Sequence, residues 1–327
     1  MTEKNVVTAI RDALHDEMAN DDRIVLLGED VGARGGVFRI SVGWLDEFGE
    51  QRVLDTPLAE SGIIGVAIGM ALHGLLPVAE IEFADFAYPA FNQLISEAAK
   101  WRYRSNNGWG LPLVVRAPFG AGVRGALYHS QSIEALLAHV PGLKVVVPST
   151  PYDAKGLLKA AIRDPDPVIY FEHKRAYRLL KEELPEADYT VPIGTAALRR
   201  EGDDLTVISY GITAHDALLA AEQLAGEGIE ASVLDLRTLA PLDRGAILDA
   251  ARRSGKVLIV HEDTLTGGIG GEVAAIIAEH AFDSLDAPVR RLAMPDIPAV
   301  PFNAGVEDYW LVTQEKIAAA MRELAAY

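Results

Sequence analysis

Short apolar runs alternate along the chain with longer segments in which apolar residues recur at helical spacing. The first helix is predicted from apolar side chains at every fourth position, namely Val6, Ile10, Leu14 and Met18. The polar segment 20–22 ends that helix, and the apolar run 24–28 then predicts a strand. Strands that alternate with helices in this way are typical of α/β proteins with parallel sheets.

The same alternation continues to about residue 180. Further strands are predicted at 77–83, 113–116, 145–147 and 168–171. Further helices are predicted at 63–72, at 87–103 and from Thr150-Pro151 onward. Thr150 is expected to cap the last of these helices with its hydroxyl, and Pro151 suits the first helical position.

A polar segment that contains a proline, residues 181–188, then predicts a linker. After it, strands are predicted at 205–209, 231–236, 257–260 and 290–293, and helices at 214–224, 247–252, 273–280 and 317–324. Because a domain usually has roughly 100–200 residues, a chain of 327 residues suggests two. We therefore expect two wound α/β domains, 1–190 and 191–327.

Composition narrows the class of protein. A formal net charge of -17 argues against nucleic acid as a partner, because an acidic surface repels a phosphate backbone. The absence of cysteine excludes disulfides and thiolate chemistry. The longest apolar stretch, 63–77, contains glycines and is shorter than the roughly 20 residues of a membrane span. The start of the chain has no secretory pattern, so we expect a cytoplasmic enzyme and no membrane partner.

The segment Asp55-Thr-Pro-Leu-Ala-Glu60 lies where a short strand ends and a glycine-rich helix begins. Ligands of open α/β sheets gather at the carboxyl ends of strands, so Glu60 is a candidate to exchange a proton with a ligand. From its position alone, Glu60 is better explained as a helix N-terminal glutamate that the helix dipole favours. In Phe83-Ala-Asp-Phe-Ala-Tyr88, likewise, Phe86 suits either a stack on an aromatic ligand or the core.

Residues 120–131, Gly-Ala-Gly-Val-Arg-Gly-Ala-Leu-Tyr-His-Ser-Gln, form a glycine-rich loop. His129 is a candidate acid–base group, since histidine titrates near neutral pH. Arg124 suits a carboxylate or a phosphate. A surface histidine followed by the helix-capping Ser130 is the alternative interpretation.

Two other segments carry weaker signals. Asp164-Pro-Asp-Pro167 suits either a cation site or a plain turn. The segment Thr266-Gly-Gly-Ile-Gly-Gly-Glu272 has no Gly-x-Gly-x-x-Gly frame, which argues against a dinucleotide site.

Several segments in the same order resemble the beta subunits of thiamine-diphosphate-dependent 2-oxo acid dehydrogenases. The resemblance is carried by Leu27-Gly-Glu-Asp-Val31, Asp55-Thr-Pro-Leu-Ala-Glu60, Ala98-Ala-Lys-Trp-Arg-Tyr-Arg104, Tyr128-His-Ser-Gln-Ser132, Ser149-Thr-Pro-Tyr-Asp-Ala-Lys-Gly156 and Asp235-Leu-Arg-Thr238. It implies a pyrimidine-binding domain at 1–190 and a transketolase C-terminal-like domain at 191–327.

The resemblance also implies roles for individual residues. Glu60 matches the glutamate that hydrogen-bonds the aminopyrimidine ring of thiamine diphosphate, while Leu58 and Phe86 match positions that contact this ring. His129 matches an active-site histidine that handles protons near the incoming lipoyl group. The role of Arg124 stays open. So does that of Glu82, where many relatives have glutamine.

A potassium site built largely from backbone carbonyls is implied at Leu113, Ala161, Ile162, Asp164 and Asp166. The Gly-Asp-Gly motif with which thiamine enzymes hold Mg²⁺ and the diphosphate is absent from the sequence. The resemblance therefore implies an alpha subunit that holds them, in a heterotetramer of two alpha and two beta chains. The enzyme would decarboxylate a small-molecule 2-oxo acid and pass the acyl group to lipoamide on an acyltransferase partner.

The segments 83–93 and 128–131 look more like the branched-chain 2-oxo acid type than the pyruvate type. A pyruvate or acetoin dehydrogenase beta subunit, a self-sufficient transketolase-like synthase and a non-catalytic assembly subunit are the alternatives. Finally, Gly62, Gly65 and Gly69 give the helix near residue 65 a smooth face. That face suits either burial within this chain or contact with another subunit.

Overall fold

The computed structural model describes residues 2–327 and divides into two compact units. The first unit comprises the chain through Phe119 together with Leu136–Ile193. The second comprises Gly120–Ala135 together with Gly194–Tyr327. The sequence analysis did not foresee that the glycine-rich loop 120–131 groups with the C-terminal residues.

A parallel sheet forms the centre of the first unit. Its strands run in the order β6-β7-β5-β4-β2-β3. Their bounds are β2 Ile24–Gly28, β3 Val53–Asp55, β4 Leu76–Glu80, β5 Val114–Phe119, β6 Lys144–Val146 and β7 Val168–His173. The strands predicted from apolar runs are confirmed, as expected for strands that are buried on both faces.

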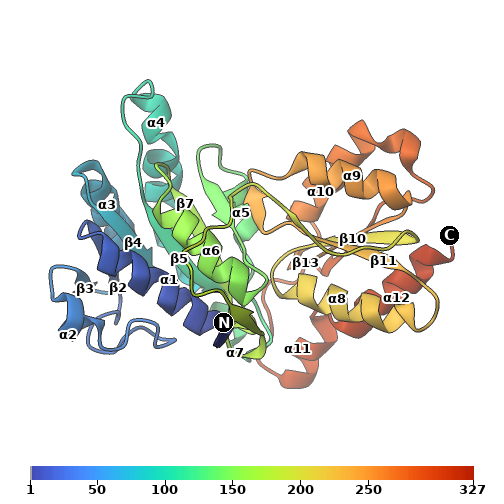
Figure 1. The fold of residues 1–327 in the computed structure, drawn as a ribbon, viewed down its shortest axis with the longest axis horizontal. Helices are drawn as coiled ribbons and strands as arrows, with labels where there is room; N and C mark the ends of the chain where they lie inside the picture. Colours follow the sequence, from blue (N-terminus) through green and yellow to red (C-terminus); the bar gives the residue numbers. More distant parts are fainter. Residues whose placement is uncertain (1) are drawn as a thin grey trace. The chain divides into compact units, whose positions relative to one another are not determined.

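Helices cover this sheet. They are α1 Val6–Asn20, α2 Trp44–Phe48, α3 Glu60–Leu72, α4 Trp101–Arg104, α6 Pro151–Ile162 and α7 Ala176–Leu179. Helices α1 and α6 lie side by side, and α3 packs on β4 and β2 (Figure 1). The capping prediction is confirmed, because the Thr150 hydroxyl accepts the backbone N–H of Asp153 at 3.1 Å.

The single helix predicted at 87–103 is confirmed only in part, because the helical segment is irregular. The segment instead consists of 3₁₀ turns at Tyr88–Ala90 and Ala98–Lys100, a π-helical turn at Gln93–Glu97 and then α4. Pro89 has no N–H to donate within a helix, and a π turn adds a residue to the helical repeat. Apolar periodicity alone does not report such irregularities.

The linker prediction is wrong in its first half. Residues Lys181–Leu184 form β8, which pairs antiparallel with β1, Thr2–Asn5. Only Leu184 in β8 is buried. The strand is therefore held mainly by backbone hydrogen bonds and leaves no apolar signal in the sequence.

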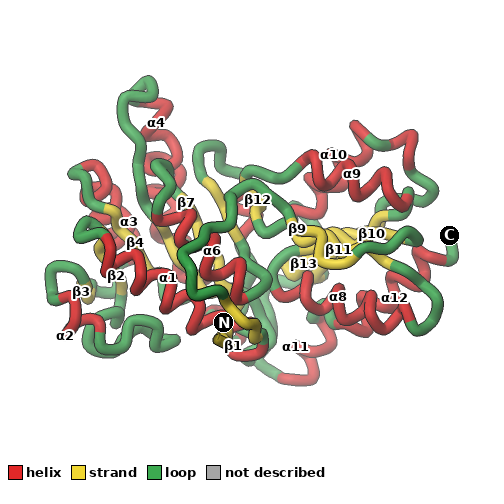
Figure 2. The backbone as a smooth tube through the Cα atoms, viewed as in Figure 1, coloured by secondary structure: helices red, strands yellow, loops and turns green. Residues whose placement is uncertain are grey.

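The second unit has its own sheet, in the order β14-β13-β10-β11-β9, with only β9 antiparallel to its neighbour. The bounds are β9 Ala197–Arg200, β10 Leu205–Ser209, β11 Ala231–Asp235, β13 Val257–Thr264 and β14 Arg290–Met294. Strand β12, Thr238–Ala240, is not part of this five-stranded sheet. Figure 2 shows β9, β11, β10 and β13 as neighbours.

Helices flank both faces of this second sheet. Helices α8 Ile212–Ala225 and α12 Gln314–Ala325 cover one face, and α9 Arg244–Ser254 and α10 Ile269–His280 cover the other (Figure 1). Two short helices complete the chain, α5 at Glu134–Ala138 and α11 at Ala304–Trp310. The main core lies where α8 and α12 meet β10, β11 and β13, around residues such as Val207, Val233 and Ile317.

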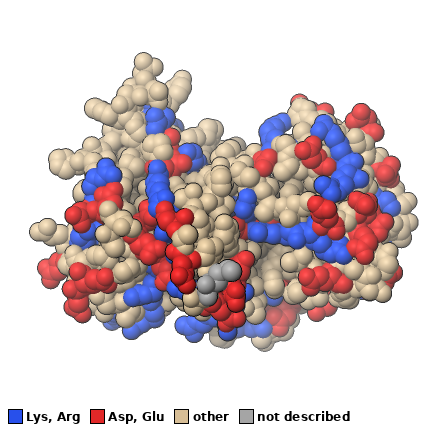
Figure 3. All heavy atoms as spheres, viewed as in Figure 1, with Lys and Arg blue, Asp and Glu red and all other residues tan. Residues whose placement is uncertain are grey.

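Charged side chains of both signs are intermixed on the face drawn in Figure 3, although the end of the first unit near α4 carries few of them. Two large apolar side chains of this end, Tyr103 and Trp109, are 90% and 66% exposed. Within residues 2–327, no helix has the length and apolar character that crossing a bilayer requires.

Candidate functional site

Three glutamates, Glu29, Glu60 and Glu82, come shortly after the carboxyl ends of strands β2, β3 and β4 of the first sheet. Strands β2 and β4 are parallel neighbours, with Gly28 opposite Glu80. Glu29 comes directly after β2, and Glu82 comes two residues after β4. Glu60 is the first residue of α3. Their carboxylates therefore start from the edge at which ligands of parallel sheets bind.

The electrostatics show that these three carboxylates are close to one another. Burial raises the pKa of Glu82 to about 7, and the charges of Glu29, Asp30, Glu80 and Glu60 add to this shift. Burial, with Asp30 and Glu60, also raises the pKa of Glu29. Among residues 2–327, no lysine or arginine is paired with Glu29, Glu60 or Glu82. The group therefore suits a ligand that donates a proton or carries positive charge.

A second set of carboxylates, Glu80 and Glu172, shares one buried cation. The Arg116 guanidinium donates to both Glu172 oxygens, at 2.6 and 3.0 Å, and to Glu80 Oε2 at 2.7 Å. The Tyr177 hydroxyl also donates to Glu172. All three members of this ion triplet are almost completely buried. It is a structural unit of the sheet and offers no open position to a ligand.

The two predicted ring-contacting residues belong to the same unit as Glu60. Leu58 precedes α3 and is 72% exposed. Phe86 is half-buried and packs edge-to-face on Phe83, with ring centroids 5.5 Å apart. Leu58 is therefore outside the buried core, and Phe86 lies at its margin.

His129 lies in the second unit, on the loop 120–131. The loop closes where the Gly120 N–H donates to the Gln131 carbonyl at 3.1 Å. His129 is half-buried. The helix that follows, α5, begins only at Glu134, so Ser130 does not cap it. Arg124 is paired with Glu307 and Asp308 of the same unit and is therefore not free to bind an external anion.

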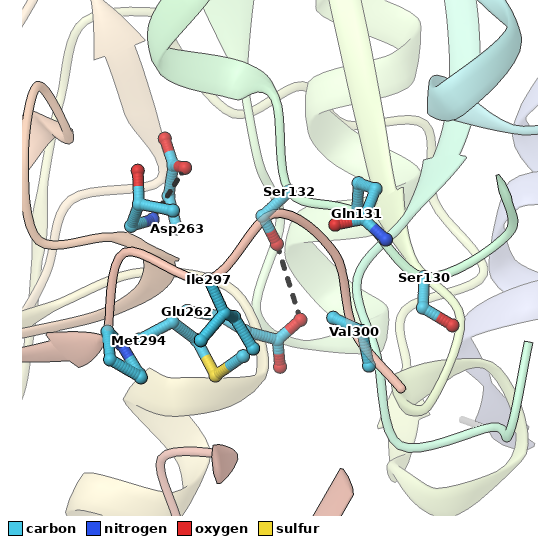
Figure 4. Close-up of a pocket in the computed structure, with 10 residues that line it drawn as sticks. Ser130, Gln131, Ser132, Glu262, Asp263, Met294, Ile297 and Val300 are labelled. Atoms are coloured by element: carbon cyan, nitrogen blue, oxygen red, sulfur yellow. Dashed lines mark hydrogen bonds between the residues drawn. The ribbon is translucent and has the colours of Figure 1, made fainter. Parts of the chain in front are cut away.

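Below this loop is a small hollow of about 30 Å³, lined by residues that include Ser130, Ser132, Glu262 and Asp263 (Figure 4). That volume suits one or two water molecules and is far too small for a cofactor. Burial raises the pKa of Asp263, and it raises that of the neighbouring Glu134 well above the usual range. Glu134 also accepts the Tyr210 hydroxyl at 2.8 Å.

Comparison with known proteins identifies the domains. Residues 2–179 match the transketolase pyrimidine-binding domain, and residues 194–317 match the transketolase C-terminal domain. The chain is 61% identical to the 2-oxoisovalerate dehydrogenase subunit beta of Bacillus subtilis (strain 168), over the full length of both chains. This chain belongs to the family of 2-oxo acid dehydrogenase beta subunits.

Two further relatives place the chain within this family. The pyruvate dehydrogenase E1 component subunit beta of Bacillus subtilis (strain 168) is 45% identical, again over both full lengths. A solved structure described as a split gene transketolase, inactive beta4 tetramer, aligns with a TM-score of 0.80 and 26% identity, covering 98% of each chain. The predicted fold, two α/β domains of the transketolase type, is therefore confirmed.

The family uses thiamine diphosphate, and the first unit fits the pyrimidine end of this cofactor. Glu60 and its two neighbouring glutamates are uncompensated acids, as a partner with basic ring nitrogens requires. Leu58 and Phe86 offer apolar surface outside the core. Within residues 2–327, no group of three or more acidic or histidine side chains is arranged to hold a metal ion.

The five residues implied in a potassium site all lie in the first unit. The Val168 N–H donates to the Leu113 carbonyl at 2.9 Å, and the Asp164 N–H to the Ala161 carbonyl at 3.2 Å. Ile162 lies at the buried end of α6. The carboxylates already have partners, since Lys144 pairs with Asp164 and Arg102 with Asp166. A cation would therefore be held by backbone carbonyls, which have a second lone pair.

Sequence reasoning missed the residues that support the His129 loop. Glu262 and Asp263 follow the apolar run Val257–Val260 at the carboxyl end of a strand, which was an available signal. Glu307 carried no comparable signal, because α11 was not predicted and nothing in the sequence joins it to residues 120–131.

Proposed function

We propose that this chain is the beta subunit of the decarboxylating component of a branched-chain 2-oxo acid dehydrogenase. The observation that carries the proposal is the uncompensated Glu60 at the start of α3, within the pyrimidine-binding domain. Similarity to the 2-oxoisovalerate type at 61%, against 45% for the pyruvate type, supports a branched-chain substrate over pyruvate.

Thiamine diphosphate supplies the electron sink for decarboxylation when it is bound. In this chain, Glu60 holds a proton at a nitrogen of the pyrimidine ring. Leu58 and Phe86 contact that ring and exclude water from it. His129 is the acid–base group that serves the transfer of the acyl group to lipoamide.

The chain needs a partner to complete the site. Its sequence has no Gly-Asp-Gly motif, so we assign Mg²⁺ and the diphosphate to an alpha subunit. One face of α3 is exposed at Gly62, Gly65, Val66 and Gly69, and a Cβ at Gly69 would meet no atom within 4 Å apart from its chain neighbours and the backbone of its own helix. Burial within this chain therefore does not explain the glycines, which supports the subunit-contact interpretation. We propose a cytoplasmic heterotetramer of two alpha and two beta chains, which serves a lipoyl-bearing acyltransferase.

We further propose that K⁺ binds the carbonyls of Leu113, Ala161, Ile162, Asp164 and Asp166 as a structural ion. Thermal unfolding of the chain in KCl and in NaCl at equal ionic strength tests this. KCl is expected to raise the unfolding temperature relative to NaCl. Identical unfolding in both salts would show that the chain has no such K⁺ site.

Co-expression with the alpha chain encoded by the same cell tests the main proposal. The purified complex is expected to oxidise 3-methyl-2-oxobutanoate faster than pyruvate, and the chain alone is expected to be inactive. A preference for pyruvate would favour the pyruvate-type alternative. Calorimetry that shows micromolar, Mg²⁺-dependent cofactor binding by the chain alone would favour a self-sufficient synthase.

A further inference from the structure

The backbone of the loop that carries His129 adopts several unfavourable conformations. Arg124 and Ala126 have φ values of +62° and +58°, in the left-handed region that residues with a Cβ avoid. Gly120 and Gly122 also have positive φ, of +86° and +82°. Such a backbone persists only where surrounding contacts fix it. Those contacts therefore identify the residues that determine where His129 lies.

The first contact is with Glu307 of α11. Its carboxylate is completely buried, accepts the Gly122 N–H at 2.9 Å and pairs with Arg124. The neighbouring Asp308 accepts hydrogen bonds from both terminal nitrogens of Arg124, at 2.8 and 3.1 Å. A buried carboxylate with these two partners holds the backbone at 122 and the side chain at 124 together.

The second contact is with Glu262 of β13. It accepts the Ala121 N–H at 2.7 Å and the Ser132 hydroxyl at 3.3 Å, the latter drawn in Figure 4. Ala121 itself is buried in an apolar cluster with Met294, Val300 and Leu311. Glu262 and this cluster therefore fix the two ends of the loop, and Glu307 fixes its middle.

The middle of the loop leads directly to His129. A Cβ added at Gly125 would lie 2.7 Å from the His129 carbonyl oxygen and 2.8 Å from the His129 Cβ. Gly125 thus packs against His129, immediately after the residue that Glu307 and Asp308 hold. A shift of Arg124 would move Gly125 and with it His129.

We propose that Glu307 is a positioning residue, which holds the 120–132 loop through Gly122 and Arg124 so that His129 is presented for catalysis. The inference rests on the proposed role of His129. It differs from a purely structural ion pair, because it predicts a loss that is confined to the loop and to the step that His129 serves.

Amide hydrogen exchange on the enzyme assembled with its alpha chain tests the positional part. In Glu307→Gln, peptides that cover 120–132 are expected to exchange at least tenfold faster, while peptides from β10 and β13 stay unchanged. Glu227→Gln is the matched control, since Glu227 also pairs with an arginine, Arg322, within the second unit. Unchanged exchange in 120–132 would overturn the proposal.

Activity of the single and double variants tests the functional part. Glu307→Gln and His129→Ala are each expected to reduce lipoamide-dependent flux at least tenfold. The double variant is expected to be no worse than His129→Ala, because residues that act through one another are not additive. Losses that multiply in the double variant would overturn the proposal.

Two further measurements separate the possible failures. Arg124→Gln removes the same ion pair by changing an exposed side chain, so it tests the contact if Glu307→Gln does not fold. It is expected to accelerate amide exchange in the loop. Unchanged exchange would overturn the proposal. Full activity of His129→Ala would overturn the proposed role of His129 and the functional part together. Reduced activity of His129→Ala beside unchanged exchange in Glu307→Gln would overturn the positioning role alone.

Discussion

The first unit contains two neighbouring groups of glutamates. They differ in whether an arginine side chain is paired with them. Glu80 and Glu172 share the buried Arg116, which offsets one of their two charges, and burial with the Glu172 charge still raises the pKa of Glu80. Glu29, Glu60 and Glu82 have no such partner among residues 2–327, and burial with mutual repulsion raises the pKa of Glu82 and of Glu29.

The difference distinguishes a group that stabilises the fold from a group that is suited to bind a ligand. A buried group that is paired with a cation destabilises the fold when that cation is removed. A group of carboxylates without a cation destabilises the fold when no ligand is bound. A ligand that supplies a proton or a positive charge removes this cost. The same residue type on the same sheet thus has opposite consequences, which mutation of each group can reveal.

Glu60→Gln should have the largest effect on activity. The amide keeps the size of the side chain but cannot hold or release a proton, so activity of the assembled enzyme is expected to fall by roughly 10²- to 10⁴-fold. Proton exchange at the reactive carbon of the bound cofactor should fall in parallel. The measurement is deuterium exchange followed by NMR of the quenched cofactor.

Glu50→Gln is the control for this change, since Glu50 is an exposed glutamate of the same unit. The two variants should unfold at the same temperature as the unmodified chain. Unchanged proton exchange of the cofactor in Glu60→Gln would contradict the role assigned to Glu60. This carboxylate would then be structural, like those of Glu80 and Glu172.

Arg116→Met should have the largest effect on stability and tests the other side of the comparison. Removing the guanidinium leaves Glu80 and Glu172 buried without a counter-charge, which costs roughly 3–5 kcal/mol in the free energy of unfolding. Urea denaturation followed by circular dichroism measures this loss.

The triple variant Arg116→Met, Glu80→Gln, Glu172→Gln should recover much of the lost stability, because no buried charge is then left alone. Arg322→Met, which breaks an exposed ion pair with Glu227, should change stability little. An Arg116→Met chain as stable as the original would show that the triplet is not structural.

Much of the fold was predictable because local apolar patterns report buried strands and amphipathic helices. Strands β2 and β10 appear at the residues predicted, since each is apolar throughout and buried on both faces. Strand β8 and the irregular helix before α4 were not predictable, because backbone pairing and a π turn leave little trace in side-chain pattern.

The site divides in the same way. Glu60 and His129 could be proposed from the sequence because a strand-end carboxylate and a loop histidine are local signals. The support of His129 by Glu307 was not found, because it joins residues more than 180 positions apart through a backbone N–H that any residue could donate. Local pattern thus suggests candidate reacting groups, whereas the contacts of the loop that carries one of them become visible only in the tertiary structure.

Helix α3 allows a test of whether a partner completes the uncompensated group. Glu60 begins this helix, and the exposed face of the helix includes Gly69. A Cβ added at Gly69 would meet no atom within 4 Å apart from its chain neighbours and the backbone of the same helix. Gly69→Leu should leave folding of the chain intact, and loss of the glycine favours the helix by about 1 kcal/mol. Assembly with the alpha chain should weaken at least tenfold, as measured by analytical ultracentrifugation.

Ala67→Leu is the contrasting variant, because Ala67 lies on the buried face of the same helix. It should lower the unfolding temperature of the chain itself, since a larger side chain overpacks the core. A Gly69→Leu chain that assembles normally, or one that unfolds, would show that this face is not the contact with the alpha subunit.

Glu82→Gln should have the smallest effect, and its sign depends on pH. The folded chain holds the Glu82 proton up to a pKa of about 7, above the ordinary value of 4.5, so ionisation of Glu82 opposes folding as pH rises between these values. Glu82→Gln should therefore raise the unfolding temperature at pH 8 and change it little at pH 4.5. Thermal scans of the chain alone provide the measurement, with the exposed Glu222→Gln on α8 as the control. An unfolding temperature that shifts equally at both pH values would mean that Glu82 ionises as freely in the folded chain as in the unfolded one. The group would then lack the repulsion that distinguishes it from the Arg116 triplet.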